Sequence, residues 1–255
     1  SKNQIHERRA NGELNWIAQN KTSYNFSYTY SPDNKPHTPL HIGEQGYTYD
    51  ANGNQTGWNH DVSAQNRQIS WDEENRVKSI SDNGEQFNYT YDGSGDRVLK
   101  SSGQGQTVRV NGKTVAKTGG LSNYTVYVNP YMVVRSGGFT KHFYIEDQRI
   151  VSKLGESGNG KSSGSGVKNN GNTGGGNGNN LESFQFYYHP DHLGNATFIT
   201  DGLGEVYQHL EYFPFGETFI EEHGNRERTP YLYNGKDLDE ETGLDYYGER
   251  YYNSK

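Results

Sequence analysis

The sequence predicts an all-β fold built on an antiparallel sheet, and three observations carry that prediction. Only 29% of the 255 residues are hydrophobic and 13% are aromatic, so the long aliphatic stretches of helical bundles and doubly wound α/β proteins are missing. The chain also contains 33 Gly and 7 Pro, which is typical of many tight turns between short strands. Finally, aromatic residues recur at regular intervals along the chain, and this excludes disorder throughout.

The aromatic residues mark a repeat of about 20 residues. The last aromatic residues of four successive segments, Tyr30, Tyr49, Trp71 and Tyr91, lie 19, 22 and 20 positions apart. Within a segment, aromatic residues at alternate positions share one face of a strand. One such unit cannot bury its aromatic face alone, so neighbouring units are expected to stack into a continuous sheet. The segments are Phe26–Ser31, Tyr47–Asn54, Ile69–Arg76 and Phe87–Asp96.

Each repeat also carries a turn signature. An Asp directly after the aromatic strand can cap its own turn through its carboxylate. Three residues later, Gly or Asn supplies the left-handed backbone conformation that these residues tolerate best. The same signature returns nearer the C-terminus, and we interpret all of these residues as structural. They are Tyr49, Asp50, Gly53, Trp71, Asp72, Asn75, Tyr91, Asp92, Gly95, Asp191, Gly194, Asp201 and Gly204.

The stretch after the repeats stays β-like until residue 154 and then changes composition. Residues 155–180 contain ten Gly and no aromatic residue, which is typical of a disordered linker or a surface loop. The expected organisation is a repeat sheet over residues 1–154, this linker, and a final domain over residues 181–255. Further strands are expected at 107–110 and 113–116, joined as a hairpin by Asn111-Gly112, and at 124–128 and 142–145.

The repeats and the C-terminal motifs together resemble one known family. Tyr49-Asp50-x-x-Gly53-Asn54 is similar to the YD repeat. The motif Tyr188-His189-x-Asp191-His192-Leu193-Gly194 resembles the Rhs repeat-associated core domain. So does the ending Gly243-Leu244-x-Tyr246-Tyr247-x-x-Arg250-Tyr251-Tyr252. The chain thus resembles the Rhs/YD-repeat proteins over about residues 24–100 and 184–255.

This resemblance implies a fold and a function. It implies that the repeats spiral into a hollow β-shell, of which this chain would be a part, with a flexible Gly/Asn-rich insertion. In bacterial members the shell encloses a variable C-terminal toxin. The implied function is therefore that of a structural shell fragment of a secreted polymorphic toxin, which encapsulates and delivers an effector. The implied partners are that cargo, the remaining shell repeats and delivery-apparatus proteins, and the implied location is secreted or at the bacterial cell surface.

The resemblance also concerns self-cleavage. It implies that the core domain, incomplete here over residues 181–255, plugs one end of the shell. It implies too that this domain cuts the chain beyond itself with aspartates placed after the Arg-Tyr-Tyr motif. The sequence stops at Lys255, before such aspartates, so we expect no protease activity from this chain. Only Arg250 is carried over from the motif, as a residue that orients the cleavage site, and an autoprotease in a longer chain stays open as an alternative.

Two polar clusters offer metal ligands, but a structural interpretation is favoured for both. His189, Asp191 and His192 supply two imidazoles and a carboxylate, yet their spacing does not place both histidines on one face of a strand. The acidic run Asp237–Glu241 lacks the alternating oxygen ligands and the central Gly of a calcium loop. We expect a solvated acidic turn at this run, and predict neither a metal nor a cofactor.

Charge and composition narrow the remaining partner classes. Residues 205–250 carry twelve acidic and four basic residues, which disfavours nucleic acid as a partner. No apolar run approaches the roughly 18 residues of a membrane helix, so direct membrane insertion is not expected. The chain has no Cys and hence no disulfides. A cell-surface adhesion or glycan-binding module stays open, because Trp16 and Trp58 could stack on sugars and YD repeats resemble those of adhesion proteins.

Overall fold

The fold is described from a computed structural model of the chain. It describes residues 5–8, 14–17, 27–31, 37–103, 107–110, 113–117, 123–135, 138–156, 182–223 and 229–254. The chain divides into two compact units, Ser1–Ile69 and Ser70–Lys255, and each unit is described by itself. In the described residues every regular element is a strand except one short 3-10 turn, η1 (Tyr233–Gly235). The predicted all-β class is confirmed.

The first unit consists of short antiparallel strands. Two of them, β1 (Ile5–Arg8) and β2 (Leu14–Ile17), pair only with each other. The others pair in chain order, and Tyr47 lies opposite Trp58 in the ladder between β5 and β6. These strands are β3 (Tyr28–Tyr30), β4 (Pro39–Ile42), β5 (Gln45–Tyr49), β6 (Gln55–His60) and β7 (Asn66–Trp71), the last of which carries the boundary between the units.

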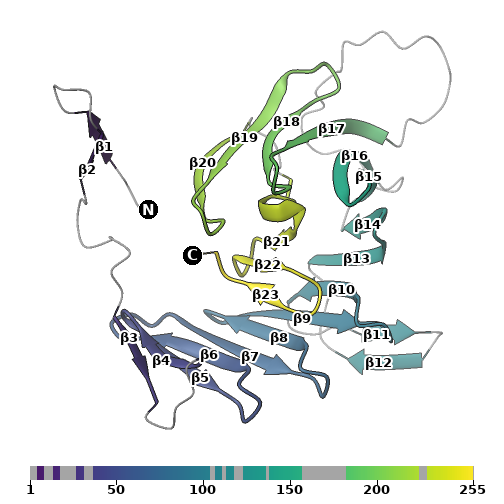
Figure 1. The fold of residues 1–255 in the computed structure, drawn as a ribbon. Coiled ribbons are helices and arrows are strands. Elements are labelled where there is room, and N and C mark those ends of the chain that lie inside the picture. Colours follow the sequence, from purple (N-terminus) through teal and green to yellow (C-terminus); the bar gives the residue numbers. More distant parts are fainter. Residues whose placement is uncertain are drawn as a thin grey trace. The chain divides into compact units, whose positions relative to one another are not determined.

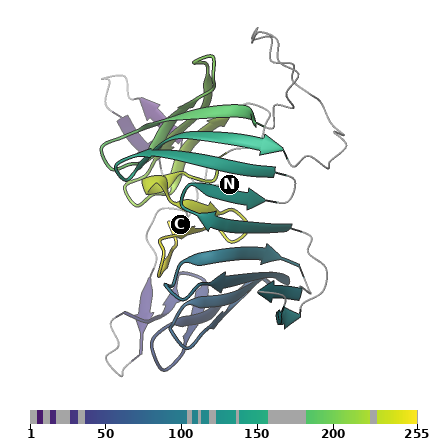
Figure 2. The same ribbon diagram turned by 90° about the vertical axis from the view of Figure 1, so that its right-hand side faces the viewer.

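In the second unit the strands from β8 to β20 follow one another in chain order in an antiparallel sheet. Only β11 (Thr107–Val110) and β12 (Lys113–Lys117) leave this order, as a separate hairpin. Figures 1 and 2 show the strands of this unit one after another. They are β8 (Val77–Asp82), β9 (Glu85–Tyr91), β10 (Arg97–Ser102), β13 (Asn123–Asn129), β14 (Met132–Arg135), β15 (Gly138–Ile145), β16 (Gln148–Glu156), β17 (Glu182–Pro190), β18 (Ala196–Thr200), β19 (Val206–Tyr212) and β20 (Thr218–His223).

The hairpin turns show why the Asp signature recurs. At the first one, Asp50 Oδ1 accepts hydrogen bonds from the backbone N–H groups of Asn52 (2.9 Å) and Asn54 (2.8 Å). Gly53 closes the turn with φ +87°, a conformation that costs other residues free energy. The carboxylates of Asp72, Asp92, Asp191 and Asp201 accept the same pair of backbone bonds, with Asn75, Gly95, Gly194 and Gly204 at positive φ.

Residues 229–252 leave the large sheet and pack back against one of its faces. We call these residues the C-terminal strap and the face that they cover the inner face. The strap contains η1 and a small antiparallel sheet of β21 (Asp237–Asp239), β22 (Leu244–Tyr246) and β23 (Tyr251–Tyr252). In Figure 1 the strap is yellow, and its small sheet lies beside β10 and β13. The strap's Tyr231 and Leu232 complete an apolar core with Phe186, Tyr188, Ala196, Ile199 and Leu210.

The strands expected after the repeats are confirmed by β13, β15 and the β11–β12 hairpin, whose Asn111-Gly112 turn lies outside the described residues. Of the expected linker over residues 155–180, Gly155 and Glu156 instead belong to β16 and pair with β15. Residues 157–180 lie outside the described residues. Among the helical elements described, none is long and apolar enough to cross a membrane.

Candidate functional site

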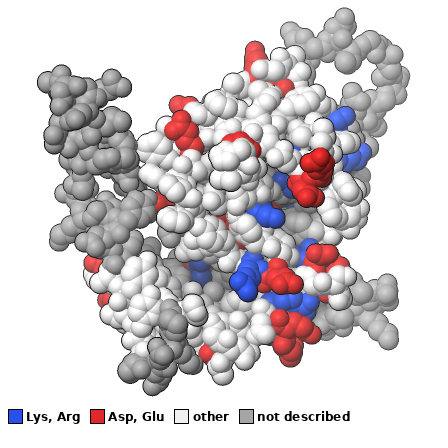
Figure 3. All heavy atoms as spheres, in the orientation of Figure 1, with Lys and Arg blue, Asp and Glu red and all other residues white. Residues whose placement is uncertain are grey.

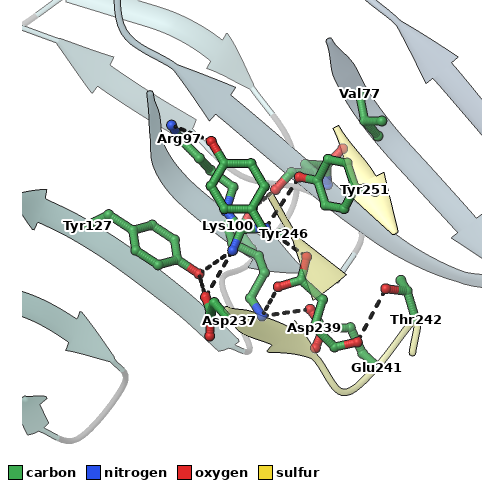
Figure 4. Close-up of polar contacts among 12 residues, drawn as sticks. Val77, Arg97, Lys100, Tyr127, Asp237, Asp239, Glu241, Thr242, Tyr246 and Tyr251 are labelled. Carbon is green, nitrogen blue, oxygen red and sulfur yellow. Dashed lines mark hydrogen bonds and ion pairs between the residues drawn. The ribbon is translucent and has the colours of Figure 1, made fainter. Parts of the chain in front are cut away.

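The strap is tied to the inner face by a cluster of buried charges from two distant parts of the sequence. Strand β10 contributes Arg97 and Lys100, and a register shift between Arg97 and Leu99 leaves both cations on the inner face. Strand β21 contributes Asp237 and Asp239, which share one face because side chains alternate along a strand. Tyr127 of β13 completes the group. We call these five residues the buried clasp (Figure 4).

Arg97 stands at the centre of the buried clasp. Its Nη1 donates to Asp239 Oδ2 at 2.7 Å and its Nη2 donates to Asp237 Oδ2 at 2.9 Å. The Arg97 and Asp239 side chains are 0% exposed and that of Asp237 is 8% exposed. The Tyr127 hydroxyl accepts a bond from Arg97 Nη2 (2.7 Å) and donates to Asp237 Oδ2 (2.6 Å). Lys100 Nζ donates to Asp239 Oδ1 at 2.8 Å, so this carboxylate bridges two cations.

Tyrosine rings surround the Arg97 guanidinium. Its Cζ lies 4.0 Å from the ring centroid of Tyr246 and 4.7 Å from that of Tyr127, within the range of cation–π attraction. The Tyr246 hydroxyl accepts the backbone N–H of Arg97 (3.1 Å), and the Tyr251 hydroxyl accepts a bond from Arg97 Nη1 (3.2 Å). Tyr246 and Tyr251 belong to the strap. The strap therefore supplies the carboxylates and part of the aromatic wall around a cation from the sheet.

The charged forms are stabilised by each other. Burial lowers the pKa of the Arg97 guanidinium, but the neighbouring Asp239, Tyr127, Tyr251 and Asp237 outweigh it and raise this pKa well above its usual value. The pKa of Asp237 is lowered overall. Burial alone would raise this pKa, but the attraction of the surrounding cations, above all Arg97, outweighs the effect of burial. The clasp is thus a compensated set of charges in a dry environment, which becomes costly if one member is removed.

The difference between Arg97 and Arg76 shows how the sequence places the clasp. In the turn after Trp71, Arg76 is the fifth turn residue, and its Nε donates to the first one, Asp72, at 2.8 Å. In the turn after Tyr91, the fifth position holds Asp96 and the arginine comes one residue later. Arg97 therefore begins β10 and points away from its own turn, toward the strap.

A second cationic group lies beside the clasp. Arg149 Nη1 donates to the carbonyl of Gly235 (3.0 Å), and its guanidinium Cζ lies 3.4 Å from the ring centroid of Tyr231. Arg135 Nη2 lies 3.8 Å from Asp237 Oδ1. Since Arg97, Lys100, Arg135 and Arg149 come from the sheet while Asp237, Asp239 and Glu241 come from the strap, the two surfaces carry opposite charges.

A chain of hydrogen bonds holds the beginning of the strap. His142 Nδ1 and Ser152 Oγ are 2.8 Å apart, Ser152 Oγ donates to the Tyr188 hydroxyl (3.1 Å), and that hydroxyl meets Thr229 Oγ1 at 2.7 Å. Burial, followed by the nearby Arg149 and Arg135, lowers the pKa of His142 to about 3. His142 is therefore neutral at physiological pH, and Ser152, also buried, acts in packing and is shielded from any substrate.

Asp245 lies on the other face of the small strap sheet. It is opposite Leu238 in β21 and opposite Tyr252 in β23, so its side chain points away from Asp237 and Asp239. Asp245 is 2% exposed, and burial, with smaller effects from Asp239 and Asp237, raises its pKa to about 6. The carboxyl group of Asp245 is thus a source of instability at neutral pH and does not form a carboxylate pair with Asp239.

One prediction for the acidic run is wrong. The expected solvated turn over Asp237–Glu241 holds for Glu240 and Glu241, which are exposed, but Asp237 and Asp239 are buried against β10. Local spacing could not reveal cations that lie about 140 positions earlier. The available signal was charge segregation, with acidic residues concentrated in residues 205–250 and an arginine displaced by one position in the third turn.

Among the other predicted residues, Tyr91 reaches the wall of the clasp, where its hydroxyl lies 3.2 Å from that of Tyr251, whereas the His189 group and Arg250 lie apart from the clasp. Asp191 accepts backbone bonds within its turn, while His189 Nε2 contacts Thr200 Oγ1 (3.0 Å) and His192 is exposed, so these three do not converge. In the part of the chain that is described, no group of three or more His, Asp or Glu side chains could hold a metal ion. Arg250 is exposed, and its carbonyl accepts the N–H of Tyr247 at 2.9 Å.

Comparison with known proteins finds relatives in structure only. No family model matches the sequence, and no curated protein matches it. The chain is similar to the crystal structure of TcdB2-TccC3, with a TM-score of 0.52 and 18% identity over 92% of this chain and 13% of that chain. The structure of TcdB2-TccC3-TEV gives a TM-score of 0.52 and 19% identity over 82% and 12%. The Tc holotoxin pore of Photorhabdus luminescens gives 0.52 and 18% over 91% and 12%.

The chain has a Tc toxin-like fold. At 18–19% identity the likeness concerns the fold alone, and the chain spans only about an eighth of the length of these solved chains. Within this Tc toxin-like fold, the buried clasp has the chemistry of an attachment point. Both Arg97 Nη atoms, Lys100 Nζ, the Tyr127 hydroxyl and three of the four carboxylate oxygens are engaged with one another, while Arg97 Nε and Asp237 Oδ1 are buried without a hydrogen-bond partner. The contacts of the clasp therefore hold the strap on the sheet.

Proposed function

We propose that this chain is a structural fragment of a β-shell in a secreted bacterial polymorphic toxin of the Rhs/YD-repeat kind, and that it acts by containment. The Tc toxin-like fold and the continuous antiparallel order of its strands support this proposal. The shell would hold a C-terminal effector away from solvent and proteases until delivery. Its partners would be that effector, further shell repeats and delivery-apparatus proteins, and its location the cell surface or the exterior.

The observation that carries the proposal is the buried clasp. It fixes the strap to the inner face through charges that would be left uncompensated if the strap moved away. The end of the strap is also held, because the Tyr252 hydroxyl donates to the carbonyl of Phe215 at 2.7 Å. A polypeptide that continues after the strap would therefore start from a fixed point beside the inner face. This is the arrangement that enclosure of a C-terminal cargo requires.

The same residues support architecture over catalysis. The repeat aspartates bind their own turns, and Asp237 and Asp239 are neutralised by cations. We therefore propose that the chain has no hydrolase activity. Incubation with a synthetic peptide that continues past Lys255 should leave the peptide intact, and specific cleavage would contradict this part of the proposal.

Containment can be tested by fusing a protease-sensitive, unfolded passenger after Lys255. Shielding predicts slower proteolysis of the passenger than in the same passenger fused to an unrelated folded protein. An Arg97→Met variant, which weakens the clasp, should lose this protection, whereas an Arg76→Met variant should keep it. Equal cleavage rates in the fusion and in the unrelated control would contradict containment.

The adhesion alternative receives less support from the structure. The Arg67 guanidinium lies 5.8 Å from the ring centroid of Trp58, so an arginine already occupies one stacking face of this residue. The side chain of Trp16 lies outside the described residues. A saturable signal on a glycan array that disappears in Trp58→Ala would restore this alternative.

A further inference from the structure

Four exposed apolar residues lie along one edge of the second unit. Successive strands run in opposite directions, so every second turn comes to the same edge of the sheet. The turns β13–β14, β15–β16, β17–β18 and β19–β20 share one edge in this way. These turns carry Tyr131, Leu193 and Phe215, which are 61%, 60% and 77% exposed, and Ile145, 63% exposed, ends β15 directly before its turn. We call these four residues the apolar rim.

The apolar rim departs from the pattern of the earlier repeats. The third position of each Asp turn is polar at Asn52, Glu74 and Ser94, as expected for a loop tip in water. The equivalent positions of the later turns hold Leu193, Leu203 and Phe215, of which Leu203 lies on the opposite edge of the sheet. Side chains this exposed contribute little to the stability of the fold, so packing inside the chain does not explain the change.

The rim residues are spaced regularly. Two strands separate neighbouring turns on one edge, which places them about 10 Å apart. Tyr131 also packs edge-on against Tyr144, with 5.8 Å between ring centroids, and this extends the apolar surface along the edge. Large exposed apolar surfaces mark interaction sites more often than isolated exposed residues do.

The charges beside the rim indicate what would cover it. Glu146 and Asp147, both exposed, form the tip of the turn that follows Ile145, and the Asp191 carboxylate lies two residues before Leu193. Arg149 beside Tyr144 is already engaged, because it donates to the Tyr144 hydroxyl (2.9 Å) and to the Gly235 carbonyl (3.0 Å). Figure 3 shows acidic and basic side chains interspersed with uncharged areas on one face of the molecule. A partner that pairs with these carboxylates needs Lys or Arg next to its own apolar side chains.

From this edge we infer a docking surface for another protein, which presents apolar side chains flanked by Lys or Arg. The rim supplies apolar contacts and its acidic neighbours supply orientation and charge selection. The surface lies on exposed turns and is separate from the buried clasp, and it meets the strap where the Tyr252 hydroxyl donates to the Phe215 carbonyl. The inference goes beyond containment and does not depend on it.

The test uses two synthetic amphipathic peptides with one shared pattern of Leu residues, one with Lys and the other with Glu at the polar positions. Fluorescence anisotropy with the intact chain should show binding of the Lys peptide and little binding of the Glu peptide. The combined variant Ile145→Asn, Leu193→Asn and Phe215→Asn should weaken binding of the Lys peptide by at least about tenfold, the loss typical of central interface residues.

The matched control is Leu203→Asn. Leu203 is 75% exposed at the third position of the β18–β19 turn, on the opposite edge, so this variant should bind like the parent chain. Equal binding by the rim variant, equal binding of the two peptides, or an equal loss in Leu203→Asn would overturn the inference. Light scattering tests a second copy of the chain as the occupant. If the parent chain forms a concentration-dependent dimer and the rim variant does not, the inference is overturned as well.

Discussion

Arg97 Nη1 and Asp239 Oδ2 lie 2.7 Å apart although 142 positions separate the two residues in the chain, and both side chains are fully buried. A compensated pair of this kind contributes modestly to stability in comparison with well-packed apolar residues, but losing one partner is costly. The strap therefore has one favourable position on the sheet. Partial detachment would leave charges buried without a partner or expose the tyrosines around them.

Removing the central cation should destabilise the second unit. Arg97→Met leaves Asp237 and Asp239 with fewer counter-charges, so we expect a loss of about 3–5 kcal/mol in the free energy of unfolding. Arg76→Met is the matched control, since Arg76 pairs with Asp72 in a partly exposed turn, and its loss should stay within about 1 kcal/mol. Urea unfolding of both variants measures the difference, and equal losses would show that the clasp carries no special role.

A second prediction concerns two glycines with the same backbone conformation. Gly53 and Gly216 have φ of +87° and +91°, so alanine at either position costs about 1–2 kcal/mol through the backbone. A Cβ at Gly53 meets nothing within 4 Å, whereas a Cβ at Gly216 would lie 2.5 Å from the ring of Tyr233 in the strap. Gly216→Ala should therefore lose a further 1–3 kcal/mol or so. Thermal unfolding gives the melting temperature of each variant. Equal decreases in the two variants would contradict this contact.

The raised pKa of Asp245 predicts that replacing this residue increases the free energy of unfolding in a pH-dependent way. Its folded-state pKa of about 6 lies above the ordinary value of 3.8, so its contribution to stability is complete below about pH 4 and is lost as the pH rises through 6. Asp245→Asn should accordingly raise the free energy of unfolding at pH 7 by about 1–2 kcal/mol. The gain should disappear at pH 4. A constant gain at both pH values would mean that burial of the carboxylate is not its cause.

Local chemistry made much of this fold predictable. Asp50, Asp72 and Asp92 bond to backbone groups two and four residues later, so a single sequence window contains both partners. The alternate spacing of aromatic residues around Tyr47 and Tyr89 also lies within one short window, and it predicts the strands that contain them. Turn positions of this kind therefore follow from short-range patterns.

The buried clasp could not be predicted in this way. The partners of Asp237 and Asp239 lie in β10 and β13, and no short window contains both sides of an ion pair formed at such separation. A run of acidic residues is most often solvated, and burial is decided only when the strap returns to the sheet. The one-position shift from Arg76 to Arg97 was visible in the sequence, but its meaning depends on the register of β10.

Hydrogen exchange along the strap tests the central claim most directly, because it reports whether residues 229–252 are held on the inner face. In the parent chain, the backbone amides of β21–β23 should be protected nearly as well as those of β17–β19. In Arg97→Met the strap amides should exchange much faster while β17–β19 stay protected, and in Arg76→Met neither should change. Strap amides that exchange in the parent chain as fast as exposed turns would contradict the account.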